Sequence, residues 1–138
     1  MKTMKLSDLL ADKPLPYHVP DARSLIRKKL LESGKRIVVI DDDPTGGQTT
    51  HDVRVLMDWS VDTLRKTLAA GDPLFFISTN SRSLNPAEVK TVSLEVGRNL
   101  REAARIEGAD IVLVSRSDST LRGHFPYEIE SLASGFGQ

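Results

Sequence analysis

The chain has 138 residues, and its 19 lysines and arginines balance its 19 aspartates and glutamates. This length fits one domain, and 39% hydrophobic with 28% charged residues is typical of a globular protein. The neutral balance gives no general attraction to nucleic acid or to an anionic membrane, and the lack of cysteine excludes disulfides, thiol catalysis and zinc–thiolate sites. Because the sequence has neither an apolar run of the ~20 residues that span a membrane nor a secretory signal, we expect a cytoplasmic protein.

The first part of the chain is predicted to be an extended lead-in followed by a helix. Residues 1–20 contain three prolines, which disfavour regular structure. Asp21 can cap a helix that Gly34 would end. We therefore expect an extended lead-in over residues 1–20 and one domain over residues 21–138.

Three short apolar runs predict the strands of a parallel sheet. They cover Ile37–Ile40, Leu74–Ile77 and Ile111–Val114, and none of them alternates with polar residues. Such runs are typical of strands that are covered on both faces. Val53–Met57 is a weaker fourth candidate, either as a strand or as an edge.

Helical signals fill the intervals between these runs. Ser60 can begin a helix before the second run, and Pro126 can open a final helix. The clearest signal is Asn85, with proline next and Glu88 at the third helical position, which is the pattern of a capping box. Since strands and helices alternate, we predict a three-layer α/β fold with a mostly parallel sheet and helices on both faces.

Each of the three strong strands is followed by a polar loop. The loops cover residues 41–52, 78–83 and 115–124. In open parallel sheets ligands bind just beyond the carboxyl ends of the strands. We therefore expect the loops to converge on one site, and their coincidence is more informative than any single loop.

The first loop begins with three consecutive aspartates, followed by Pro44 and a pair of glycines. Aspartates at this place can bind substrate hydroxyls or act as a general base, and the glycines let the backbone approach a ligand closely. A solvated turn capped by aspartate is the structural alternative. The loop is not a Walker phosphate loop, because no Gly-Lys-Ser/Thr follows.

The other two loops contribute arginines. Arg122 could form a bidentate pair with a carboxylate or phosphate, and Asp118 could take a hydroxyl proton or simply hold Arg122. Arg82 is a second candidate clamp for an anion. Arginines together with hydroxyl and carboxylate groups suit a small polyhydroxy acid. The three histidines show no spacing of a transition-metal site, so no metal ligand is predicted.

Three motifs make the chain resemble a known family. DDDPTGGQTTHD (41–52), TNSRSL (79–84) and SRSDSTLRGHFPYE (115–128) resemble, in order, motifs of the N-terminal sugar-acid-binding domain of the four-carbon acid sugar kinases. The resemblance implies an ATP-dependent phosphorylation of threonate, erythronate or a 3-oxo-tetronate at its terminal hydroxyl. Gln48-Thr49 departs from the family pattern, which leaves the choice of acid open.

The resemblance also implies roles for individual residues. Asp43 and Asp118 would be the catalytic pair, either of them serving as base or hydroxyl orienter. The substrate-binding residues would be Asp42, Thr45, Gly46, Ser81, Arg82, Ser119, Thr120, Arg122 and Gly123.

The family's C-terminal nucleotide-binding half has no counterpart in this sequence. ATP and Mg²⁺ therefore belong to the intact family enzyme, and we expect neither to bind this chain alone. The expected partners are a small sugar acid and either a second copy of the chain in a homodimer or a C-terminal half on another chain, with no nucleic acid and no membrane.

Two alternatives remain open from the sequence. Asp41-x-Asp43-x-Thr45 after a strand fits the first motif of haloacid-dehalogenase-like phosphatases, with Asp41 as nucleophile and Asp43 as acid/base. The acidic pair that those enzymes carry after a later strand does not follow Val114 here. The second alternative is a non-catalytic binding module.

Overall fold

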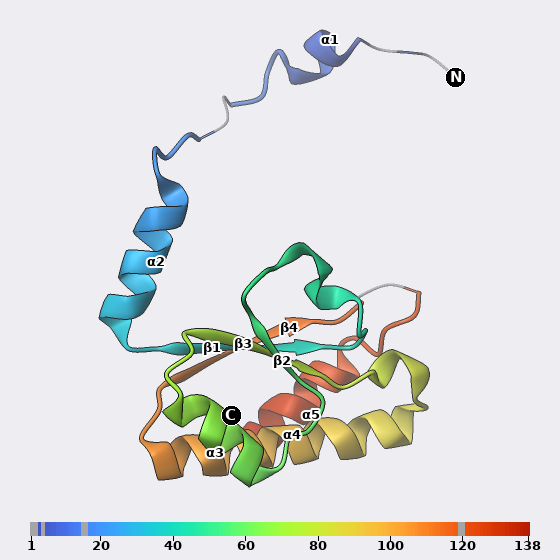
Figure 1. Ribbon diagram of the computed structural model, residues 1–138. Coiled ribbons are helices and arrows are strands. Elements are labelled where there is room, and N and C mark those ends of the chain that lie inside the picture. Colours follow the sequence, from blue (N-terminus) through green and yellow to red (C-terminus); the bar gives the residue numbers. More distant parts are fainter. Residues whose placement is uncertain (1–2, 4, 15–16, 119–120) are drawn as a thin grey trace.

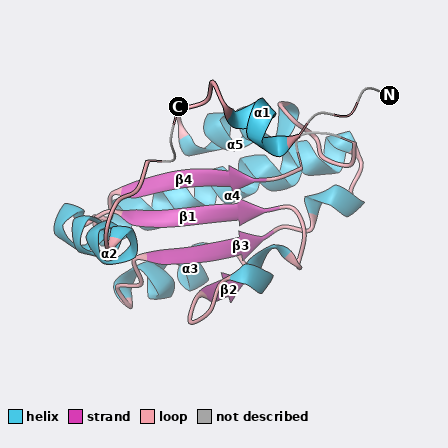
Figure 2. Ribbon diagram, turned by 90° about the horizontal axis from the view of Figure 1, so that it is seen from above, coloured by secondary structure: helices cyan, strands magenta, loops and turns pink. Residues whose placement is uncertain are grey.

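A computed structural model describes residues 3, 5–14, 17–118 and 121–138. Its sheet has four parallel strands, β1 (Arg36–Asp41), β2 (Arg54–Leu56), β3 (Leu74–Ser78) and β4 (Ile111–Arg116). The strand order is β2-β3-β1-β4, and all arrowheads point the same way (Figure 2). The carboxyl ends of the strands therefore share one edge of the sheet, as the apolar runs predicted.

The helices lie on both sides of this sheet. α3 (Val61–Ala69), α4 (Pro86–Glu107) and α5 (Tyr127–Phe136) lie against one face, whereas α1 (Leu6–Leu10) and α2 (Ala22–Ser33) lie on the other side (Figure 1). Two short 3₁₀ turns, η1 (Gly46–Thr49) and η2 (Ser81–Ser83), follow β1 and β3. The predicted three-layer α/β class with a parallel sheet is confirmed.

The core lies between the sheet and the layer of α3, α4 and α5. Val38 of β1 and Phe75 of β3 are fully buried there, and they pack in one cluster with Val96 and Leu100 of α4. Each such side chain contributes about 1.5–3 kcal/mol relative to an exposed one. This packing holds β1 and β3 in the middle of the sheet and fixes where their loops emerge.

β4 differs from the prediction that it is covered on both faces. It is an edge strand, and Val112 and Val114 on its outer face are 38% and 41% exposed. In β1 and β3 the positions level with Val114, which are Val39 and Phe76, are buried. The apolar run predicted the strand correctly, but a run without alternation does not distinguish a central strand from an edge one.

The local signals at the helix ends have unequal outcomes. The capping box is confirmed: Asn85 Oδ1 accepts from the N–H groups of Ala87 and Glu88 at 3.0 and 3.1 Å, and Glu88 Oε2 accepts from Asn85 N–H at 3.0 Å. Asp21 does precede α2, but it has a left-handed backbone with φ of 54° and its side chain makes no capping bond.

The lead-in is not extended throughout, because α1 forms within it. Leu6, Leu9 and Leu10 recur at helical spacing in a stretch without proline, which accounts for the short helix. Among the helices of the described ranges, none is both long and apolar enough to span a membrane.

Candidate functional site

Residues of all three polar loops meet beyond the carboxyl ends of β1, β3 and β4. Arg82, in η2 after β3, reaches Asp42 and Asp43 after β1, and Asp118, after β4, also contacts Asp42. The parallel register explains this meeting, because Asp41 is level with Ser78 on one side and with Arg116 on the other. The predicted convergence of these residues is therefore present.

Arg82 is the centre of the cluster. Its Nε and Nη2 donate to Oδ2 and Oδ1 of Asp42 at 3.1 and 2.9 Å, and its Nη1 donates to Oδ2 of Asp43 at 2.6 Å. These hydrogen bonds raise the pKa of Arg82, first through the bond to Asp42. The guanidinium neutralises adjacent carboxylates that would otherwise repel each other, and much of its donor capacity is used within the protein.

Asp42 is therefore a buried support of the site. Its side chain is 1% exposed, and its Oδ2 accepts a further hydrogen bond, 3.1 Å long, from the backbone N–H of Asp118. Ser81 is likewise fully buried, and its hydroxyl donates to Glu128 at 2.7 Å. In this structure neither Asp42 nor Ser81 presents its side chain to solvent, although the sequence proposed both as hydroxyl-binding residues.

Asp43 is more open than its neighbour, with a side chain that is 24% exposed. Its Oδ1 accepts from the N–H and the hydroxyl of Thr45 at 2.8 and 2.7 Å. These bonds, with a smaller contribution from Arg82, lower the pKa of Asp43. A carboxylate with a lowered pKa is a weak base but a good acceptor for a hydroxyl, so Asp43 is better suited to orient a hydroxyl than to remove its proton.

The third loop brings Asp118 and Arg122 to the same edge. The side chain of Asp118 is 18% exposed, and its Oδ2 lies 3.8 Å from Nε of Arg122, whose own side chain is 70% exposed. This distance is too long for a direct hydrogen bond. Arg122 can therefore turn its guanidinium toward an anion without breaking a tight pair. Ser119 and Thr120, also proposed from the sequence, lie outside the described residues.

Asp41 and Arg116 form a pair that the sequence analysis did not predict. Nη1 of Arg116 donates to Oδ2 of Asp41 at 3.2 Å, and Asp41 is 2% exposed. Burial raises the pKa of Asp41, while a backbone hydrogen bond from Asp43 and the charge of Arg116 act against it. The two residues are register partners at the ends of neighbouring strands, so the predicted strand pairing was the signal that could have revealed them.

Two glycines of the site leave no room for a side chain, one against side-chain atoms and the other against the backbone. A Cβ atom on Gly46 would lie 1.5 Å from Oδ2 of Asp41 and 2.4 Å from Nη1 of Arg116. A Cβ atom on Gly123 would lie 1.5 Å from the carbonyl oxygen of Asp118. Any side chain at either position would displace the cluster, which gives these glycines a packing role at the site.

The burial of Asp41 bears on the phosphatase alternative. A nucleophilic carboxylate must present an oxygen to the phosphorus atom of its substrate. In this structure Asp41 is 2% exposed and its Oδ2 faces Arg116. The geometry therefore does not favour Asp41 as a nucleophile.

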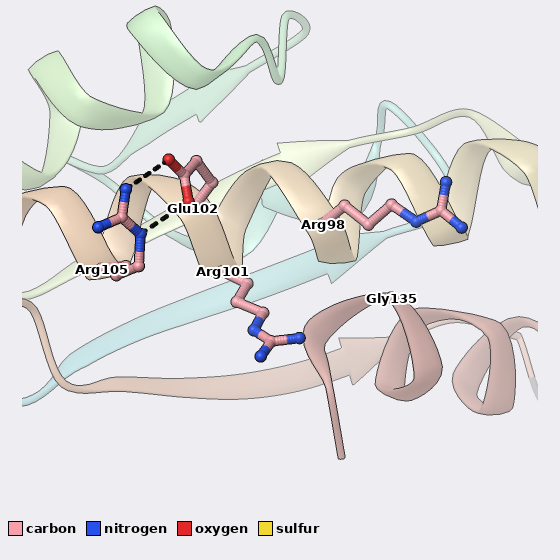
Figure 3. Close-up of a pocket in the computed structure, with 5 residues that line it drawn as sticks. All are labelled: Arg98, Arg101, Glu102, Arg105 and Gly135. Atoms are coloured by element: carbon pink, nitrogen blue, oxygen red, sulfur yellow. Dashed lines mark hydrogen bonds and ion pairs between the residues drawn. The ribbon is translucent and has the colours of Figure 1, made fainter.

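A separate cavity of about 500 Å³ lies between the outer side of α4 and the end of α5. It is lined by Arg98, Arg101, Glu102, Arg105 and Gly135 (Figure 3). Arg105 makes two hydrogen bonds to Glu102 at 2.9 and 2.7 Å. Figure 3 shows the three arginines pointing in different directions, so they do not converge on one anion.

Residues 3, 5–14, 17–118 and 121–138 hold no group of at least three histidine, cysteine, aspartate or glutamate residues that could bind a metal ion. The carboxylates at the strand ends are instead neutralised by arginines.

Comparison with known proteins gives one match. The model of a family described as a sugar-binding N-terminal domain matches residues 37–138. The match therefore includes the strands that build the cluster, except Arg36 at the start of β1, and all of their loops. No curated protein and no solved structure matches the chain.

Proposed function

The chain belongs to the family of sugar-binding N-terminal domains, and from this premise we propose that it is the substrate-binding part of an ATP-dependent kinase. The substrate would be a four-carbon sugar acid, either threonate, erythronate or a 3-oxo-tetronate, phosphorylated at its terminal hydroxyl. The chain would then be a member of the four-carbon acid sugar kinase family, which its three motifs resemble.

The observation that carries the proposal is the pairing of Arg82 with Asp42 and Asp43 beside Asp118 and Arg122. It unites the three motifs at the strand ends, where α/β folds bind small ligands. The cluster offers carboxylate acceptors for hydroxyls and an exposed guanidinium for a carboxylate, within one small region. A short polyhydroxy acid needs both kinds of group.

The exposure of each residue supports a division of roles. Arg122 would bind the carboxylate of the acid, because its side chain is 70% exposed and only loosely held by Asp118. Asp43 and Asp118 would accept hydrogen bonds from hydroxyls, and one of them would orient the hydroxyl that receives the phosphoryl group. Arg82 and Asp42 would hold this arrangement in place, with Thr45 fixing the carboxylate of Asp43.

ATP and Mg²⁺ would come from a nucleotide-binding half outside this sequence. Phosphoryl transfer depends almost wholly on positioning and charge neutralisation, so the chain alone would bind the acid with little or no turnover. The partner chain in this proposal is either a second copy in a homodimer or a C-terminal half on another chain, and the proposed location is the cytoplasm. The exposed Val112 and Val114 of β4 offer such a partner an apolar surface.

Isothermal titration calorimetry can test the division between the two halves. The chain would be titrated with threonate, erythronate and a 3-oxo-tetronate, and separately with ATP and Mg²⁺. Binding of a sugar acid without binding of ATP is the expected result. Binding of ATP without binding of any sugar acid would contradict the assignment as a substrate half. Binding of a neutral four-carbon polyol as tightly as the acids would contradict the assignment of an acid substrate.

A further inference from the structure

Glu128 is a buried carboxylate that the proposed ligand contacts do not use. It lies in the first turn of α5 and is 2% exposed. Its Oε1 accepts a 2.7 Å hydrogen bond from the hydroxyl of Ser81, a residue that is fully buried and 47 positions away in the sequence. The bond joins α5 to the turn that follows β3.

Ser81 is the residue directly before Arg82 in η2. The 3₁₀ turn is short and tightly bonded: Ser83 N–H donates to Asn80 O at 3.1 Å, and Arg82 N–H donates to Asp42 O at 3.3 Å. A displaced Ser81 would therefore move the backbone from which the Arg82 side chain extends. The hydrogen bond to Glu128 fixes one side of this turn, and the bonds to Asp42 fix the other.

Stability alone does not account for a carboxylate at position 128. Oε2 of Glu128 is buried and has no hydrogen-bond partner in the described part of the chain. Leaving a buried polar oxygen without a hydrogen bond is costly, and an apolar side chain of similar volume is often the more stable choice in such a place. The carboxyl group is instead explained by the hydrogen bond that it accepts from Ser81.

We infer that Glu128 is a positioning residue that holds Arg82 against Asp42 and Asp43 through Ser81. α5 packs closely on α4, since a Cβ atom on Gly97 would lie 2.5 Å from the carbonyl oxygen of Leu132. Glu128 thus anchors the turn that carries Arg82 to a rigid pair of helices rather than to a loop. The effect on ligand binding rests on the proposed function, whereas the positioning of Arg82 does not.

Proton exchange at the Arg82 side chain tests the positioning without any ligand. Nε of Arg82 donates to Asp42 at 3.1 Å, so its proton should exchange slowly with water in an NMR measurement on the ¹⁵N-labelled chain. In Ser81→Ala and in Glu128→Ala we expect exchange to be about tenfold faster, which corresponds to the loss of one typical hydrogen bond. Because the two residues act as one unit, the double variant should be no faster than either single one.

Two further variants separate positioning from a general loosening. Glu128→Gln keeps the acceptor for Ser81, so the exchange rate of the Arg82 Nε proton should stay within about twofold of the wild-type rate. Ser131→Ala is a matched control, because like Ser81→Ala it removes a buried serine hydroxyl. The hydroxyl of Ser131 lies in α5 and donates to Tyr127 O. If Glu128→Ala does not fold, Ser81→Ala and Glu128→Gln still decide the question.

The inference is overturned if Ser81→Ala leaves the exchange rate unchanged, or if Ser131→Ala accelerates it equally. Titration with threonate then distinguishes this inference from the proposed function. Faster exchange in Ser81→Ala together with no binding of any sugar acid to the wild type would support the positioning of Arg82 and contradict the proposed function.

Discussion

Arg82 and Asp42 face each other through two side-chain hydrogen bonds, Nε to Oδ2 at 3.1 Å and Nη2 to Oδ1 at 2.9 Å, across 40 positions of sequence. The pair joins the end of β1 to the turn after β3, two strands that are neighbours in the sheet. It therefore serves both the fold and the site, because the same guanidinium also bonds Asp43.

Replacing Arg82 should destabilise the chain strongly. In Arg82→Met the carboxylate of Asp42, which is 1% exposed, loses its cation, and breaking a buried pair in this way costs about 3 kcal/mol or more. Arg105→Met is the control, because the Arg105 side chain is 69% exposed and its pair with Glu102 should contribute less than about 1 kcal/mol. Urea unfolding at neutral pH measures both losses. Equal losses would contradict the role given to Arg82.

Gly46 and Gly47 are adjacent but should respond differently to alanine. Gly46→Ala places a Cβ atom 1.5 Å from Asp41 Oδ2, and relieving such an overlap costs about 1–3 kcal/mol. In Gly47→Ala the nearest atom, Cγ2 of Val55, is 3.7 Å away, which is an ordinary contact. Thermal unfolding of the two variants should show a lower Tm for Gly46→Ala only. A similar Tm for both would mean that Gly46 does not lie against the Asp41–Arg116 pair.

The raised pKa of Asp41 predicts a particular pH dependence. Burial is its main cause, and the ordinary aspartate pKa, expected in the unfolded chain, is 3.8. Between that value and the higher folded-state pKa the folded chain binds more protons, so the contribution of Asp41 to stability falls as the pH rises through this window. Asp41→Asn lacks this loss, and its free energy of unfolding should therefore rise relative to the wild type across the same window.

Asp58 provides the control of opposite sign. Hydrogen bonds from Thr63 and Ser60 lower its pKa, so its contribution to stability is present above pH 3.8 and is lost as the pH falls through its folded-state pKa. The free energy of unfolding of Asp58→Asn should therefore fall relative to that of the wild type as the pH rises from the folded-state pKa of Asp58 to 3.8. Urea unfolding in steps of pH measures both differences, and the same sign for both variants would contradict these assignments.

Gly97→Ala should reverse the usual preference of helices for alanine. In an exposed helix interior, alanine is favoured over glycine by about 1 kcal/mol. At Gly97 the new Cβ atom would lie 2.5 Å from Leu132 O and 2.7 Å from Phe136 N, both backbone atoms of α5. We expect a net loss of about 1–3 kcal/mol in urea unfolding, whereas Arg98→Ala, at an exposed position of the same helix, should change stability by less than about 0.5 kcal/mol. A gain for Gly97→Ala would mean that α5 does not pack this closely.

The features that the sequence predicted well depend on local signals. The capping box at Asn85 involves neighbouring residues, and the apolar runs of β1 and β3 reflect burial of the whole strand. The convergence of the polar loops follows from parallel pairing alone. These inferences needed no knowledge of which strands are neighbours.

The features that the sequence did not reveal depend on the order of the strands and on the positions of distant side chains. The edge position of β4 leaves Val114 exposed, and the apolar run of this strand did not indicate that exposure. Only the register places Arg116 beside Asp41, and only the packing of α5 brings Glu128 to Ser81. For the same reason the sequence did not show that the side chain of Asp42 is buried and paired with Arg82.

We expect a sugar acid to bind at the strand ends through Arg122. Thermal unfolding of the wild type, Arg122→Ala and the exposed, distant control Arg105→Ala, each with and without threonate, erythronate or a 3-oxo-tetronate, is the sharpest test of this binding site. A ligand at 100 times its Kd adds about 2.7 kcal/mol to the free energy of unfolding. For a chain of this size, that raises the Tm by on the order of 5–10 °C.

We expect one of these acids to raise the Tm of the wild type and of Arg105→Ala by similar amounts, and Arg122→Ala to lose most of the rise. An equal rise in Arg122→Ala would place the ligand elsewhere, and no rise in the wild type with any of the three acids would contradict the binding of a four-carbon sugar acid to this chain.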